Sequence, residues 1–173
     1  MDACKVLGPS GFEMAGQDNL GFERYTDEAE LSADVVFVRF SGKNPVFGED
    51  VQLRDKIVIY STDADAASKA PRMLAQQRAK AAIRIIDDVP ISTPQVIFEG
   101  RRRRSASVSG TISKEAAGKI AAACEVEIPT EDKAVVQIVS TDENFSFRIP
   151  VNEKKTTTPN VVGLIPGLSL IHI

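Results

Sequence analysis

The sequence predicts an α+β, mostly β domain, a β-sandwich or open barrel with two flanking helices. Many short runs are rich in β-branched and aromatic residues, two segments carry helix-start signals, and the last third contains strand-like runs alone. A doubly wound parallel sheet is the alternative, because strand, helix and strand follow one another around residues 56–86. The β-only ending argues against that alternative.

The first two thirds of the chain contain most of the expected strands. Residues 1–30 are polar and turn-rich, which predicts an irregular N-terminal segment. Asp34–Phe40 is dense in β-formers, and the near-continuous apolar run Lys56–Tyr60 indicates a strand buried on both faces. Further strands are expected at residues 82–86, 95–99 and 105–109.

Two helices are expected from their start signals. Ser68 is a plausible N-cap with Pro71 in the first turn, which predicts a helix over Ser68–Lys80. Ser113 is expected to cap a second helix over Lys114–Cys124. Its inward side chains are expected to be Ala117, Ile120, Ala121 and Cys124.

The last third is expected to contain only strands. Ala134–Val139 and Phe145–Val151 are interpreted as a pair, with a turn at Asp142-Glu143-Asn144. After a polar connector, Asn160–Ile165 is expected to be an ordered strand, and Leu168–Ile173 to be exposed or loosely attached.

The amino-acid composition limits the classes of protein to which this chain can belong. The 173 residues have 43% hydrophobic and 26% charged content, which is typical of a globular domain. The formal net charge of −3 gives no indication of a nucleic-acid partner. The sequence contains no apolar run of membrane-spanning length. Met1–Gly16 lacks the pattern of a secretion signal, and the compartment stays unassigned.

Five stretches, taken in order, resemble protease-associated (PA) domains inserted in di-zinc aminopeptidases. The last one is similar to the segment by which those enzymes leave the PA domain and enter the peptidase domain. The stretches are Leu31–Val38, Gly48–Val58, Ala79–Ile85, Val108–Gly118 and Thr157–Gly167. The sequence departs from the family pattern in three ways. Arg54-Asp55 replaces a basic residue followed by glycine, Lys80 replaces a glycine, and a proline near Val108 is missing.

The resemblance implies a PA-like domain at residues 31–158, followed at residues 159–173 by the truncated start of a peptidase domain. In the family, two zinc ions are held by the peptidase domain, where a glutamate acts as general base on a metal-bound water. The PA domain is not catalytic and covers or gates the peptide substrate cleft. The chain alone is therefore expected to lack cofactor and activity, with zinc and peptide substrate belonging to the full-length parent. The family is usually extracytoplasmic or membrane-associated.

Two other interpretations stay open. The chain resembles PA-type protein-interaction modules in general, so it also fits another protease, a sorting receptor or a membrane-bound ubiquitin ligase. The segment Asn160–Gly167 favours the aminopeptidase over these hosts. A nucleotide-binding α/β domain is a third interpretation, and the missing glycine-rich loop argues against it. Gly8-Pro9-Ser10-Gly11 is not a phosphate loop, because no Gly-Lys-Ser/Thr follows.

No catalytic, metal-binding or substrate-binding residue is assigned from the sequence. His172, the only histidine, is too close to Pro166-Gly167 to match the first zinc ligand of the family, and it is not expected to bind metal. Asp63 and Asp65 have a spacing that can serve a divalent ion, but carboxylates beside a helix N-terminus are the favoured interpretation.

Two further features are interpreted as structural. Arg101–Arg104 is expected to be a solvated loop or a protein contact, because no aromatic residues interleave with it as in nucleic-acid sites. Cys4 and Cys124 are the only cysteines, and either free thiols or one disulfide between them remain possible, with free thiols favoured.

Overall fold

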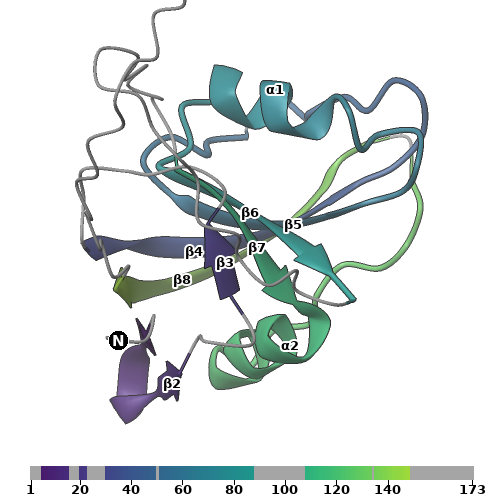
Figure 1. The fold of residues 1–173 in the computed structure, drawn as a ribbon. Helices are drawn as coiled ribbons and strands as arrows, with labels where there is room; N and C mark the ends of the chain where they lie inside the picture. Colours follow the sequence, from purple (N-terminus) through teal and green to yellow (C-terminus); the bar gives the residue numbers. More distant parts are fainter. Residues whose placement is uncertain are drawn as a thin grey trace, which may run out of the picture.

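The computed structural model describes residues 5–15, 20–22, 30–49, 51–87, 108–133 and 135–148 (Figure 1). This part of the chain forms an eight-stranded sheet with two α-helices, which confirms the predicted mostly-β α+β class. The strands are β1 (Lys5–Leu7), β2 (Glu13–Ala15), β3 (Leu20–Phe22), β4 (Glu30–Phe40), β5 (Ile57–Thr62), β6 (Ala81–Ile86), β7 (Val108–Ser113) and β8 (Gln137–Arg148). The helices are α1 (Ala70–Gln76) and α2 (Lys114–Ala123), with a 3₁₀ turn, η1, at Pro9–Gly11.

The sheet is mixed, with the strand order β2-β1-β8-β4-β5-β6-β7-β3. The four middle strands β4, β5, β6 and β7 are parallel to one another. The strands on both flanks are antiparallel. Parallel central strands are the feature that the sequence analysis associated with the alternative fold, a doubly wound parallel sheet. The β-only ending did not exclude it, because β8 adds to the flank of the parallel strands and leaves their order unchanged.

The two helices cover opposite faces of the sheet, as Figure 1 shows. Successive residues of a strand point to opposite faces, so β4 contributes Val35 and Phe37 to the core under α2, and Val36 and Val38 to the core under α1. Ile57–Tyr60 is buried throughout, as predicted for a strand covered on both faces. Each fully buried aliphatic or aromatic side chain stabilises the fold by roughly 1.5–3 kcal/mol.

The second predicted helix is confirmed, together with its cap. The Oγ of Ser113 accepts a hydrogen bond from the backbone N–H of Ala116 at 3.1 Å. Ala117, Ile120 and Ala121 are buried as expected, and Cys124 is partly buried at the C-cap.

The first predicted helix is shorter than expected, and the expected cap is wrong. Helix α1 begins at Ala70, its N-cap is Lys69, and Ser68 is exposed. The N–H groups of Lys69 and Ala70 both donate to the Ala66 carbonyl. Backbone hydrogen bonds of a turn, and not the Ser68 hydroxyl, therefore start the helix. The helix ends at Gln76 because Arg78 has a φ of +57° and the Lys80 N–H already donates to Lys56 beside β5. Pro71 lies in the first turn, as predicted.

The predicted turn at Asp142-Glu143-Asn144 is wrong, because these residues lie inside β8, a single strand of 12 residues. Asp34 pairs with Asn144 and Val36 pairs with Ser140, so Thr141, Asp142 and Glu143 lie opposite Val35 alone. This is a β-bulge, in which Asp142 has a φ of +53°. Aspartate tolerates that conformation, and turns and bulges both need it.

Several expectations fall outside the described residues. The expected strands at residues 95–99 and 160–165, and all of residues 149–173, belong to this group. The expected strand at residues 105–109 is described only from Val108, where β7 begins and continues to Ser113.

Candidate functional site

Asp63 follows β5 directly and joins the ends of two parallel strands. Its Oδ2 accepts a hydrogen bond from the N–H of Gly42 at 2.6 Å, and its Oδ1 accepts one from the N–H of Ala66 at 2.8 Å. The backbone N–H of Asp63 donates to the carbonyl of Phe40, the last residue of β4, at 3.2 Å. The hydrogen bonds from Gly42 and then Ala66 hold the pKa of this carboxyl below its usual value. Both carboxylate oxygens are thus occupied by backbone donors.

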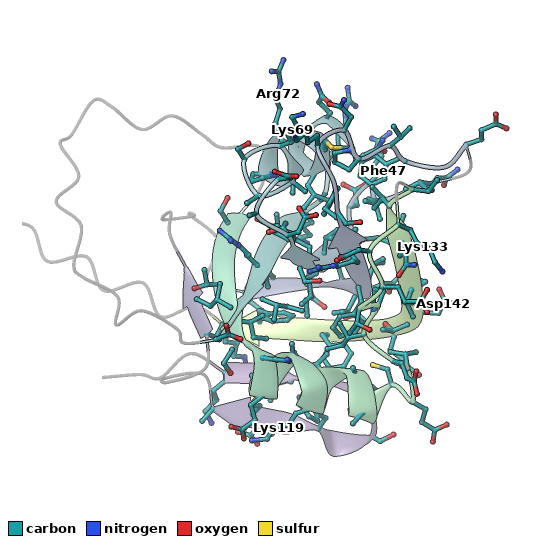
Figure 2. The ribbon with its side chains drawn as sticks, turned by 90° about the vertical axis from the view of Figure 1, so that its right-hand side faces the viewer. Phe47, Lys69, Arg72, Lys119, Lys133 and Asp142 are labelled. Atoms are coloured by element: carbon teal, nitrogen blue, oxygen red, sulfur yellow. The ribbon has the colours of Figure 1, made fainter. Side chains whose placement is uncertain are left out.

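The loop after β4 is held by side chains from distant segments. The Ser41 hydroxyl donates to the carbonyl of Lys133 at 2.6 Å. The Lys69 ammonium donates to the carbonyl of Lys43 and, at 2.8 Å, to Oδ1 of Asn44. Figure 2 shows Lys69 at the α1 end of the molecule. These bonds fix the loop, and Asp63 belongs to the same network. Asp65 is exposed, and within the described ranges no three His, Cys, Asp or Glu side chains gather as a metal site would need.

Cys124 carries a free thiol at the end of α2. Burial raises the pKa of this thiol, against the opposing effect of a hydrogen bond with Thr141. Cys124 packs, partly buried, against the core under α2, and a raised pKa makes its thiol a weaker nucleophile. Cys4, Arg101–Arg104 and His172 lie outside the described residues, and what the sequence predicts for them stays a prediction.

Gly8–Gly11 forms a tight turn at the start of η1. The N–H of Gly8 donates to the carbonyl of Phe12 at 2.9 Å, and the Phe12 N–H donates back to Pro9 at 3.0 Å. The turn packs onto Phe145, whose ring meets that of Phe12 edge to face with centroids 5.9 Å apart. This glycine-rich segment therefore packs against the edge of the core and is not itself buried.

An open hollow of about 630 Å³ lies between the loop that precedes β5 and the strands β4 and β8. Its floor is apolar: Val36 and Leu53 are buried, and Val51 and Ile138 are half-buried. The volume is within the range of small-ligand pockets, but the hollow is open to solvent. Sequence reasoning missed this site, because only the folded sheet brings residues 36, 51 and 138 together.

The rim of the hollow is polar, and its charged lining residues are one acid, Glu49, and one base, Lys56. Glu49 and Ser140 line it and are exposed. The Ser140 hydroxyl donates to Oδ1 of Asp142 at 2.9 Å, which places a second carboxylate beside the opening. The cation at the rim, Lys56, has its Nζ 3.7 Å from Oδ2 of Asp34 and is balanced by that carboxylate. The arrangement suits an apolar group flanked by polar groups.

Comparisons with known proteins were made at three levels. No family model matches the chain, and no curated protein matches it. Among solved structures, the aminopeptidase from Aneurinibacillus sp. strain AM-1 is similar, with a TM-score of 0.33 and 15% sequence identity. The match covers 84% of this chain and 32% of that one, so this chain spans about a third of the length of that aminopeptidase. In the described part of the chain, no helix is both long and apolar enough to cross a membrane.

Proposed function

We propose that the chain is a non-catalytic accessory domain of the PA type, belonging to a zinc-dependent aminopeptidase, and that it covers or gates the peptide substrate cleft. The supporting observation is where the family-like stretches lie. Leu31–Val38 lies in β4, Gly48–Val58 leads into β5, Ala79–Ile85 covers most of β6, and Val108–Gly118 forms β7 and the start of α2.

These stretches are neighbours in space although they are separate in the sequence. Val36 pairs with Val58, Val58 with Ala82, and Ala82 with Ser109, one residue from each of the four parallel strands. Four of the five stretches that resemble one family therefore assemble into the centre of the sheet, while Thr157–Gly167 lies outside the described residues.

One departure from the family pattern is also consistent with the proposed PA-type domain. Asp55 stands where the family has glycine, and its φ is +60°, in the region that favours glycine. Aspartate is among the few other residues that adopt this conformation readily. The N–H of Asp55 donates to the carbonyl of Arg78 at 3.1 Å, which fixes the turn before β5. The substitution thus preserves a backbone shape that the family pattern implies.

In this proposal the domain supplies contacts, and the chemistry belongs to the parent enzyme. The zinc ions of the parent would activate a water for attack on the peptide carbonyl. Among the described residues, both carboxylate oxygens of Asp63 accept backbone N–H groups, and burial raises the pKa of the Cys124 thiol, so the proposal gives neither side chain a part in that reaction.

The proposal is tested first on the purified chain. We expect no hydrolysis of leucine p-nitroanilide above the blank, with or without added Zn²⁺, and no stoichiometric zinc after dialysis. Two zinc ions per chain, or turnover that follows the protein through purification, would show that the chain is itself a peptidase and would overturn the accessory role.

The link to an aminopeptidase is tested by sequencing the transcript beyond the codon for Ile173. An in-frame continuation that carries a His-x-Asp stretch and further histidines and carboxylates supports it. A continuation into a serine protease or a receptor tail would instead establish the alternative, a PA-type interaction module of another host. The hollow between β4, β8 and the loop before β5 is the observation that favours this alternative, because an interaction module needs a recognition surface.

A further inference from the structure

Strand β8 contains a sequence motif for covalent modification. Asn144-Phe145-Ser146 has the pattern Asn-x-Ser/Thr, with a residue other than proline in the middle, which is the acceptor pattern for N-linked glycans. It is the only such triplet in the sequence, since no other asparagine has a serine or threonine two residues later. The pattern alone is common, so the argument for a glycan has to come from the surroundings of Asn144.

The Asn144 side chain is exposed and its amide nitrogen is accessible. Its Oδ1 accepts a hydrogen bond from the Ser32 hydroxyl at 2.6 Å. Among the described residues, none accepts a hydrogen bond from its Nδ2. A glycan is attached through Nδ2 and leaves Oδ1 as an acceptor. The bond to Ser32 can therefore persist after modification.

The face of the sheet around Asn144 is polar. Asp34 lies opposite Asn144 in the ladder between β4 and β8, and Ser32 and Ser146 form the next pair on the same face. Ser32 is exposed, and Asp34 and Ser146 are half-buried. Figure 2 shows Asp142, two residues before Asn144, at the outside of the molecule. A glycan needs such a surface, because burial of its hydroxyl groups without partners would cost free energy.

Folding hides the rest of the motif. Phe145, in the middle of the triplet, and Phe147, just after it, are both fully buried. The Ser146 hydroxyl, which the motif requires, donates to Oε1 of Glu30. The backbone of residues 144–148 is paired with β4 on one side and, from Ser146 onward, with β1 on the other. A transferase that has to bind the triplet as a separate chain can therefore act only before β8 enters the sheet.

We propose that Asn144 is the acceptor of an N-linked glycan, and that the glycan is added before β8 pairs with β4. The donor is an oligosaccharide carried on a polyprenyl diphosphate. Nδ2 bonds to the anomeric carbon of the first sugar, while the bond from that carbon to the phosphate oxygen breaks. The polyprenyl diphosphate leaves with the electron pair of the broken bond, and the amide nitrogen gives up one proton to a base of the transferase. This modification goes beyond the proposed function and does not depend on it.

The first test is secretion of the full chain from yeast behind a cleavable leader. We expect a band of lower mobility, which peptide-N-glycosidase returns to the mobility of the unmodified chain while it converts Asn144 to aspartate in the mass spectrum. Asn144→Gln and Ser146→Ala should each abolish this band. Ser146→Thr should keep it, because threonine also has the hydroxyl that the motif requires. Asn44→Gln, outside the motif, is the matched control and should leave the band unchanged.

The second test determines the order of modification and folding. The unmodified full chain, made in the bacterial cytoplasm, and a synthetic peptide of residues 140–148 are each incubated with purified oligosaccharyltransferase and its lipid-linked donor. We expect the folded chain to be modified at least about tenfold more slowly than the peptide, because only transient opening of β8 exposes the motif. Phe147→Ala removes a fully buried ring that holds β8 in place, and it should narrow that difference.

Three results would overturn the proposal: no glycan on the secreted chain, a glycan that persists in Asn144→Gln, or a folded chain that is modified as fast as the peptide. The glycosylated chain should also melt at no lower temperature than the unmodified chain. A lower melting temperature would mean that the folded face does not accommodate the glycan, and it would contradict the proposal as well. If Asn144→Gln is not secreted, the comparison of Ser146→Ala with Ser146→Thr decides the same question.

Discussion

The Oγ1 of Thr141 donates a hydrogen bond to the backbone carbonyl of Val35 at 2.8 Å, although the two residues are 106 positions apart. Val35 is fully buried in β4, and Thr141 lies in the bulge of β8. The same hydroxyl accepts a bond from the N–H of Glu143 at 3.2 Å. A side chain thus takes over the pairing that the backbone gives up at the bulge.

Replacement of Thr141 by valine should therefore destabilise the domain. The shape is kept, but the Val35 carbonyl loses its donor, and the expected loss is about 1–2 kcal/mol of unfolding free energy. Thr141→Ser keeps the hydroxyl and should lose less. Urea unfolding of both variants measures this. Equal stability of Thr141→Val and the unchanged protein would mean that the bond contributes nothing.

Asp63 should make stability depend on pH. Its folded pKa lies below the usual value of an aspartate, so its contribution to stability is fully present above that usual value and is lost as the pH falls through the folded pKa. Asp63→Ala should melt at a lower temperature at pH 7, and the difference should shrink in acid. Asp65→Ala, at an exposed neighbour, is the control. A difference that stays constant down to pH 2 would contradict the argument.

Two glycines should respond to alanine in opposite directions. At Gly8 the new methyl carbon would lie 2.4 Å from Cε1 of Phe145, a fully buried ring, so Gly8→Ala should cost about 1–3 kcal/mol. At Gly118, inside α2, nothing lies within 4 Å of the new carbon, and alanine should stabilise by about 0.5–1 kcal/mol. Thermal melts of both variants measure the two changes in stability. A stabilised Gly8→Ala would mean that the ring can move aside.

Ser113 and Ser68 test the two helix starts. Ser113→Ala removes the acceptor for the Ala116 N–H and should cost about 1 kcal/mol. Ser68→Ala should leave the unfolding free energy unchanged, because α1 starts from a backbone turn at Ala66. Chemical denaturation measures both. A large loss at Ser68 would restore the sequence-based prediction of its capping role.

Local signals in the sequence predicted the parts of this fold that depend on local chemistry. The run Ile57–Tyr60 shows its burial directly in its composition, and Ser113 is followed by residues that favour a helix. Asp142 shows where this fails. A residue that favours positive φ fits a turn or a bulge equally well, and only the 11 residues of β4 alongside decide between them.

The hollow and the hydrogen-bond network around Asp63 could not be predicted from local sequence signals. Val36 and Ile138 come from strands that pair only in the folded sheet, so no spacing in the sequence relates them. The Asp63 carboxylate was recognised as a structural group near a helix start, but its bond to Gly42 depends on β4 and β5 being parallel neighbours.

The pairing of β4 with β8 also has a consequence during synthesis on the ribosome. The side chains of Ser32 and Asn144 form a hydrogen bond between β4 and β8, and the two residues are 112 positions apart in the sequence. At roughly 5–20 residues per second, β4 would wait about 6–22 s for its antiparallel neighbour to be made. Its parallel neighbour β5 is translated much sooner, so one side of a strongly apolar strand stays open in the nascent chain. A chaperone that holds extended apolar segments would find its binding site there, and it would lose that site as soon as β8 emerges.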